Sequence, residues 1–180
     1  MSQLVKKAET NLENASMHQL RQYLTFLVGE ESFAINILDV KEIIEVNTIT
    51  RVPMTPNYIR GVINLRGNVV AVIDLAARIG RGVSTLSKRT CIVLVEVEVH
   101  DEAQTIGMLV DEVDEILEIP ESNIQPPPDF GTDIRTDFIQ AMARVGDEFI
   151  ILLEINRVLS VEELSQIQDM VETQTDAQAA

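Results

Sequence analysis

The sequence predicts a mainly β protein built from two small barrels that pack together. The chain has 180 residues, of which 46% are hydrophobic, enough for a substantial core. Short runs of aliphatic and aromatic residues are separated by turn residues, and the order of these runs occurs twice along the chain. Each repeat is too short and too rich in strand formers for a doubly wound sheet, and barrel closure removes exposed strand edges.

A hairpin is expected first, because QYLTFLV and FAINI are rich in aromatic and β-branched residues and GEES between them contains a turn glycine. The next segment, ILDVKEIIEV, favours a short amphipathic helix. Ile37, Val40 and Ile44 recur at helical spacing, while charged residues take the other face. Two prolines in RVPMTP then predict an irregular connection.

The segment GVINLRGNVVAVIDL, residues 61–75, predicts a second hairpin. Gly67 and Asn68 are expected at the centre of a two-residue type II′ turn, which would place Arg66 opposite Val69. Alternation along the strands would then put four apolar residues on a core-facing surface: Ile63, Leu65, Val70 and Val72. The opposite face would be mixed in character and would carry Val62, Asn64, Arg66, Val69, Ala71 and Ile73.

Residues 78–89 gather glycines, serines and basic residues into a predicted link, after which the pattern starts again. RTCIVLVEVEV and QTIGMLV predict another strand pair, and VDEVDEILEI repeats the earlier LDVKEIIEV. Corresponding residues of the two copies are Val40 and Val113, Glu42 and Glu115, Ile43 and Ile116, and Asp74 and Glu154. Finally, Ser160 and Glu163 have the spacing of a capping box, which predicts a C-terminal helix.

These elements predict one domain over residues 21–165, with a first barrel over about 21–87 and a second over about 88–160. The sequence leaves open whether the two barrels exchange strands. The C-terminal helix is expected over residues 160–171, and polar tails without periodicity over 1–20 and 172–180.

Charge and composition restrict the partners. The net charge of -15 opposes binding to nucleic acid or to an anionic lipid surface. The chain also has no Trp, two Tyr and five Phe, so few aromatic side chains are available for nucleic-acid bases to stack on. The single cysteine, Cys91, excludes an internal disulfide, and no apolar run is long enough for a signal peptide or membrane helix. We therefore expect a cytoplasmic protein that does not insert into the membrane.

No sequence pattern for phosphate cradles, zinc proteases or nucleophilic hydrolases occurs, and the two histidines, His18 and His100, have no partner residues near them in the sequence. The acidic run from Asp111 to Glu118 is the best candidate for metal ligands or catalytic carboxylates, but it lacks the calcium-loop pattern. Its spacing favours a solvated helix face. A metal-dependent enzyme and a barrel-type nucleic-acid binder are thus the weaker alternatives, and we expect no enzymatic activity, cofactor or metal.

The combination of QYLTFLVGEESFAINI, VKEIIEV, IRGVINLRGNVVAVIDL, IGMLVDEVDEIL and GDEFIILLEINRVL resembles the CheW-like coupling proteins of bacterial chemotaxis. The resemblance extends from about Gln22 to about Leu164, and NLRG followed by VIDL is its most specific part. One departure is Ala71, where many members of the family have proline.

This resemblance implies a double SH3-like β-barrel without catalytic activity. Such proteins bridge the cytoplasmic tips of methyl-accepting chemotaxis receptors and the regulatory domain of the histidine kinase CheA, so the chain would be recruited to receptor arrays at the membrane. The family's receptor-binding groove lies between the barrels, and the positions that match it here are Val40, Glu42, Gly61, Arg66, Gly107 and Ile116. Asn64 joins this set because it shares the predicted face of Arg66. The resemblance also implies that Glu42 pairs with a partly buried Arg66, whereas the kinase-binding residues are not assigned.

Overall fold

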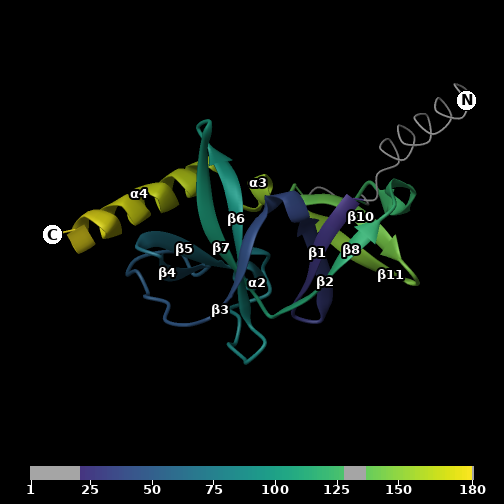
Figure 1. The fold of residues 1–180 in the computed structure, drawn as a ribbon, viewed down its shortest axis with the longest axis horizontal. Coiled ribbons are helices and arrows are strands. Elements are labelled where there is room, and N and C mark those ends of the chain that lie inside the picture. Colours follow the sequence, from purple (N-terminus) through teal and green to yellow (C-terminus); the bar gives the residue numbers. More distant parts are fainter. Residues whose placement is uncertain (1–20, 128–136, 180) are drawn as a thin grey trace, which may run out of the picture.

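The computed structural model describes residues 21–127 and 137–179, with only the backbone for 175–179, and it contains two antiparallel-rich sheets (Figure 1). The first sheet has the order β8 (Glu112–Ile119), β1 (Arg21–Val28), β2 (Glu31–Asn36), β11 (Glu148–Leu153), β10 (Ile139–Val145) and β9 (Ile124–Gln125). The second has the order β3 (Val40–Glu45), β6 (Cys91–Val99), β7 (Glu102–Val110), β5 (Asn68–Asp74) and β4 (Ile59–Leu65). The short helical elements are η1 (Ile37–Asp39), α2 (Leu75–Arg78), η2 (Glu121–Asn123) and α3 (Ile155–Val158), and α4 (Val161–Ala179) is the long C-terminal helix.

The two sheets exchange strands between the sequence repeats. Each repeat supplies a hairpin, a single strand and a second hairpin, and the second repeat adds the two-residue strand β9. The first hairpin of one repeat pairs with the remaining strands of the other. Equivalent parallel pairs, β2 with β11 and β7 with β5, join the hairpins in each sheet. A boundary near residues 87 and 88 therefore does not separate the two sheets, because the exchange distributes each half of the sequence over both.

The repeat extends to the short helices. Asp74 accepts a hydrogen bond from the backbone N–H of Ala77 and caps α2, and Glu154 accepts one from Asn156 and caps α3. The same two acidic residues donate their backbone N–H groups to Tyr58 and Phe138, at 2.7 and 2.9 Å. The correspondence between Asp74 and Glu154 is thus confirmed in three dimensions.

The predicted helix over ILDVKEIIEV is wrong. After the single turn η1, the chain continues as strand β3, in which Val40, Glu42 and Ile44 are half-buried and the residues between them are exposed. A short segment with adjacent isoleucines fits helical and alternating spacing equally well. Its pairing with β6 therefore decides that it forms a strand. The acidic run likewise forms a strand, since β8 begins at Glu112 directly after Asp111, and the predicted helix face does not exist.

The predicted turn of the 61–75 hairpin is wrong by one residue. Leu65 pairs with Asn68, so the two turn residues are Arg66 and Gly67, with φ angles of 52° and 89°. Because both angles are positive, the turn has the character of type I′ rather than II′. The predicted core face is nevertheless confirmed, since a shift of the pairing by two residues keeps the same side chains on the same side: Ile63, Leu65, Val70 and Val72 pack together.

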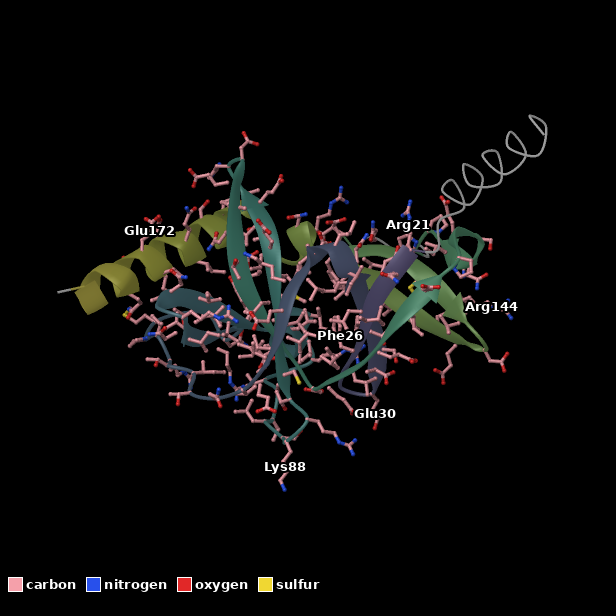
Figure 2. All side chains as sticks on the ribbon, viewed as in Figure 1. Arg21, Phe26, Glu30, Lys88, Arg144 and Glu172 are labelled. Atoms are coloured by element: carbon pink, nitrogen blue, oxygen red, sulfur yellow. The ribbon has the colours of Figure 1, made fainter. Side chains whose placement is uncertain are left out.

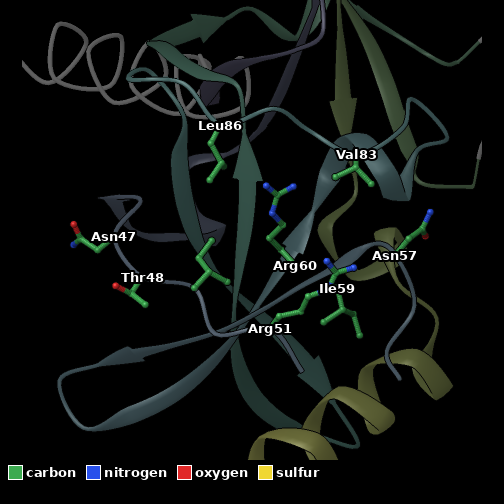
Figure 3. A pocket seen from close by; sticks show the side chains of 9 residues that line it. Asn47, Thr48, Arg51, Asn57, Ile59, Arg60, Val83 and Leu86 are labelled. Carbon is green, nitrogen blue, oxygen red and sulfur yellow. The ribbon is translucent and has the colours of Figure 1, made fainter. Parts of the chain in front are cut away.

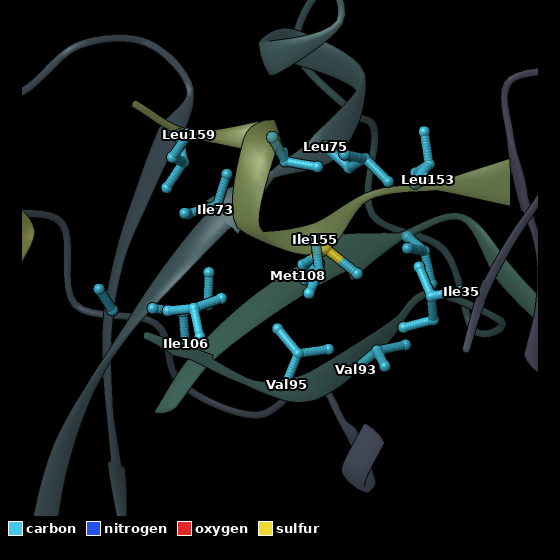
Figure 4. Packing of buried hydrophobic residues seen from close by; sticks show 14 of the residues in the cluster. Ile35, Ile73, Leu75, Val93, Val95, Ile106, Met108, Leu153, Ile155 and Leu159 are labelled. Atoms are coloured by element: carbon cyan, nitrogen blue, oxygen red, sulfur yellow. The ribbon is translucent and has the colours of Figure 1, made fainter. Parts of the chain in front are cut away.

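Among the described residues, three hydrophobic clusters hold the fold together. One cluster fills the barrel formed by the first sheet and includes Tyr23 and Leu152. Another fills the barrel formed by the second sheet and includes Ile92 and Leu94. The largest lies between the sheets and joins side chains such as Ile35, Val95, Met108 and Ile155 (Figure 4). The two barrels therefore share a core, and Ala71 and Ile73, from the mixed face of the hairpin, belong to it. Figure 2 shows Phe26 in this interior and charged side chains such as Glu30 and Lys88 at the periphery.

Helix α4 begins at the predicted capping box. The backbone N–H of Glu163 donates to Ser160 Oγ at 3.1 Å, and the N–H of Ser160 donates to Glu163 Oε1 at 2.9 Å. The helix continues to Ala179, so the predicted tail over residues 172–180 is wrong for 172–179. The other predicted tail, residues 1–20, lies outside the described residues, as does residue 180.

Arg78 attaches the start of α4 to the second sheet. Its Nε donates to the carbonyl of Val158 at 2.7 Å, its Nη2 donates to Glu163 Oε1 at 3.0 Å, and its guanidinium lies 5.3 Å from the ring centre of Tyr58. Burial raises the pKa of Tyr58 to about 12, together with a hydrogen bond to Glu163 and the charge of that carboxylate. For Glu163, burial acts to raise the pKa, but hydrogen bonds from Ser160 and Tyr58 and the charge of Arg78 leave it below its ordinary value.

Candidate interaction surface

Arg66 occupies a turn position that is unusual for its residue type. Its φ of 52° is left-handed, a conformation that costs a residue with a Cβ about 1 kcal/mol or more. Asn64 stabilises the turn, because its Oδ1 accepts a hydrogen bond from the N–H of Gly67 at 2.9 Å. The strand ends before Arg66, so the guanidinium projects from the tip of the hairpin rather than from a sheet face. Backbone strain of this kind is typical of functional sites.

The predicted contact between Arg66 and Glu42 is confirmed. Arg66 Nη2 lies 2.6 Å from Glu42 Oε1, which brings the tip of the β4–β5 hairpin against β3, although β3 and β4 are at opposite edges of the second sheet. The sheet therefore curls until its edges approach. The expectation of a partly buried arginine is wrong, since the side chains of Arg66 and Glu42 are 70% and 37% exposed. An exposed pair of this kind contributes about 0–1 kcal/mol to stability, so its main effect is to orient two charges at the surface.

A groove of about 400 Å³ adjoins this pair. Its walls come from β3, the β4–β5 hairpin, β6, the β6–β7 hairpin and α4, and they include Leu65, Val69, Leu94, Gln104 and Val171. Lys41 also lines the groove, and its Nζ donates to Thr105 Oγ1 at 3.0 Å. The arrangement offers mixed charge beside aliphatic surface, which is typical of a protein-binding site.

Gly61 and Gly107, two of the expected site residues, are required by the packing of the second sheet. Gly61 has a φ of 147°, and a Cβ there would lie 2.2 Å from the carbonyl oxygen of Thr50. At Gly107 a Cβ would lie 2.7 Å from Cγ2 of Ile92. Both glycines are buried, so they shape the barrel and present no side chain to a partner.

Val40 lies on β3 two residues before Glu42, whereas Ile116 lies on the other sheet. Val40 packs against the shared core, next to Asp39, whose pKa is raised by burial and then by the charge of Glu154. Ile116 lies on the first sheet, opposite Leu24, with 55% of its surface exposed. The structure therefore brings Glu42, Asn64 and Arg66 together and places Ile116 on the other sheet.

Three of the five carboxylates between Asp111 and Glu118 make separate contacts. Asp111 Oδ2 accepts from the N–H of Gly29 at 2.6 Å, Glu112 lies 3.5 Å from Arg89, and Glu118 accepts from Gln22 at 3.3 Å. Within residues 21–127 and 137–179 there is no group of three His, Cys, Asp or Glu side chains arranged to hold a metal ion. Nor is any helix in that part of the chain long and apolar enough to cross a membrane.

A buried polar network that was not predicted from the sequence lies under the second sheet. Asp74 is fully buried and accepts from the backbone N–H and hydroxyl of Ser84, at 2.8 and 2.7 Å. Arg60 donates from Nη1 to the same carboxylate at 3.3 Å and to the carbonyl of Ser84 at 2.9 Å. An aspartate at the end of an otherwise aliphatic strand was the available signal, because a buried carboxylate needs such partners.

Comparisons with known proteins agree with this architecture. Residues 22–177 match the family described as CheW-like domain. The chemotaxis protein CheW of Rhizobium meliloti (strain 1021) is 34% identical over 155 residues, covering 84% of this chain and 97% of the relative. That of Helicobacter pylori (strain ATCC 700392 / 26695) is 30% identical over 154 residues, covering 86% and 90%. The scaffolding protein TtCheW from Thermoanaerobacter tengcongensis has a similar solved structure, with a TM-score of 0.70, 36% identity, and coverage of 79% of this chain and 89% of that one.

The matches extend over nearly all of the residues that form the two sheets. The expected fold class, two small SH3-like barrels packed together, is confirmed by the sheets and by the likeness to the solved scaffold. The chain therefore belongs to the CheW-like family, the coupling adaptors of bacterial chemotaxis.

Proposed function

We propose that the chain couples the cytoplasmic tips of chemoreceptors to the regulatory domain of the histidine kinase CheA, and that the receptor contacts the surface around Glu42 and Arg66. The observation that carries this proposal is the strained left-handed turn that holds Arg66 2.6 Å from Glu42 while leaving 70% of its side chain exposed. A surface ion pair contributes little to stability, and a type I′ turn favours Asn, Asp or Gly at this position, so the presence of an arginine is better explained by recognition than by folding.

Four of the other expected receptor-binding residues support this surface. Asn64 fixes the turn that carries Arg66. Val40, Gly61 and Gly107 determine where the strands that form this surface lie, because they are buried or half-buried. Ile116 is a separate proposed contact, because its exposed side chain lies on the first sheet.

The chain acts without chemistry of its own, at receptor arrays on the cytoplasmic face of the membrane. In the acidic run that was the best candidate for a catalytic or metal site, Asp111, Glu112 and Glu118 each contact a different partner, which supports a binding role.

Reconstitution tests this proposal. Membranes that contain a chemoreceptor are mixed with CheA, with and without the purified chain, and kinase autophosphorylation is followed with labelled ATP. We expect strong stimulation only when receptor, kinase and chain are all present, and no label on the chain itself. Equal kinase activity with and without the chain, or phosphorylation of the chain incubated alone with ATP, would contradict the proposal.

A further inference from the structure

A second cleft, of about 550 Å³, lies in the second barrel and shares no lining residue with the groove beside Arg66. One wall is the connection between β3 and β4, and the other is the loop that follows α2 (Figure 3). The lining side chains are Asn47, Thr48, Ile49, Arg51, Asn57, Ile59, Arg60, Val83 and Leu86. Two of them are arginines and none is acidic, although the chain as a whole carries a net charge of -15.

Both arginines keep hydrogen-bonding capacity. Arg51 is exposed and has no hydrogen bond or ion pair within the described part of the chain. Arg60 is held in place through Nη1 by Asp74 and by the carbonyl of Ser84, while its Nε and Nη2 have no acceptor among the residues that the structure describes. A guanidinium that is fixed at one nitrogen and open at the others is preorganised for a carboxylate.

The walls of the cleft are firmly built. Backbone hydrogen bonds of 2.8 Å in each direction join Thr50 to Val62 beneath one wall. The other wall is attached to the core through the buried Ser84, whose hydroxyl and N–H both bond to Asp74. A cleft between two such walls costs little to order when a ligand binds.

Aliphatic side chains beside the arginines identify the class of ligand. Val83 and Leu86 remain 59% and 47% exposed at the edge of the cleft. A free inorganic anion would leave this apolar surface in water. A peptide segment that alternates carboxylates with aliphatic side chains would satisfy both features of the cleft.

We propose that this cleft is a second docking site, which binds an acidic, aliphatic segment of a partner protein through Arg51 and Arg60, with Val83 and Leu86 as the apolar contact. The site is independent of the receptor surface around Glu42 and Arg66. Because the net charge of the chain opposes an acidic ligand, the affinity is modest and falls as salt is added.

Nuclear magnetic resonance on the full chain tests the proposal. A blocked pentapeptide, Glu-Leu-Glu-Val-Glu, is titrated up to about 5 mM while the arginine side-chain N–H signals and the backbone signals are followed. We expect shifts at Arg51, Arg60 and Leu86. The matched peptide Gln-Leu-Gln-Val-Gln should bind at least about fivefold more weakly, since its amides cannot pair with the guanidinium groups.

Variants assign the contact. Arg51→Gln is expected to weaken the binding of the acidic peptide about three- to tenfold, whereas Lys88→Gln, which removes the same charge outside the cleft, and Arg66→Gln should change it less than about twofold. Because Arg66→Gln alters the receptor surface, this control separates a failure of the second site from a failure of the proposed coupling function. Equal effects of the three variants, equal binding of the two peptides, or equal shifts with sodium acetate would overturn the proposal.

Discussion

Replacing Gly61 with alanine is expected to destabilise the second barrel strongly. The new Cβ would lie 2.2 Å from the Thr50 carbonyl oxygen and 2.8 Å from Cγ2 of Ile49. The first of these atoms belongs to the backbone and cannot rotate away. It accepts the N–H of Val62 at 2.8 Å, and the N–H of Thr50 donates to Val62 at the same distance. The methyl group must therefore displace the segment that closes this edge of the sheet.

The size of the effect follows from two terms. The φ of 147° at Gly61 is open to glycine but costs another residue about 1–3 kcal/mol. Loss of the two backbone hydrogen bonds adds about 0.5–1.5 kcal/mol each. The expected total is about 4 kcal/mol, a large part of the 5–15 kcal/mol that is typical of a folded domain.

Urea unfolding followed by circular dichroism measures this loss, with Gly29→Ala as the matched control. Gly29 also has a positive φ, of 65°, but a Cβ there would meet nothing within 4 Å. Its replacement should cost only about 1 kcal/mol. If Gly61→Ala were no less stable than Gly29→Ala, the steric explanation for this glycine would be wrong and a direct role in binding would be favoured.

Three further predictions concern charged residues. Arg66→Ala and Glu42→Ala should each change the free energy of unfolding by less than about 1 kcal/mol in the same urea assay, because the pair is exposed; a larger loss would make it a support of the fold. Asp74→Ala should lower the free energy of unfolding by about 3–5 kcal/mol, because the loss of the carboxylate leaves several buried donors without an acceptor. Ser84→Ala should lower it by only about 1 kcal/mol, and equal melting temperatures of the two variants would refute this prediction. Glu163→Gln should lower the free energy of unfolding most near neutral pH. The lowered pKa of this carboxyl in the folded protein adds stability at pH values above its ordinary pKa, and this stability is lost as pH falls through the pKa of the folded state. A loss of unfolding free energy that does not become smaller in acid would contradict this prediction.

Local sequence patterns were sufficient for the hairpins and for the start of α4. QYLTFLV and FAINI form β1 and β2 around their glycine turn, and the capping box at Ser160 starts α4. Sequence patterns did not identify β3 and β8 as strands. Both are edge strands, and each exposes an isoleucine, Ile43 or Ile116, at a position where alternation predicts a polar residue. Exposed isoleucines obscure the period of two, so the helical spacing appeared equally good.

The candidate site was predictable in part. The family resemblance identified Glu42 as the partner of Arg66, and the structure confirms the contact. Its exposure was not predictable, because it depends on the turn falling at Arg66 and Gly67 and therefore lifting the guanidinium off the strand. The cleft around Arg51 and Arg60 was missed because its walls come from segments that meet only when the second sheet closes.

A charge swap across the Glu42–Arg66 pair tests the central claim most directly. Receptor-dependent stimulation of CheA is measured with the native chain, with Glu42→Arg, with Arg66→Glu and with the double variant, and thermal melting is recorded to confirm that each one folds. We expect each single variant to lose most of the stimulation while melting within a few degrees of the native chain, since the pair is exposed. Partial recovery in the double variant would show that the internal pair orients the surface, and no recovery would show that the receptor reads the individual charges. Full stimulation by both single variants would contradict the proposal that the receptor binds at this surface.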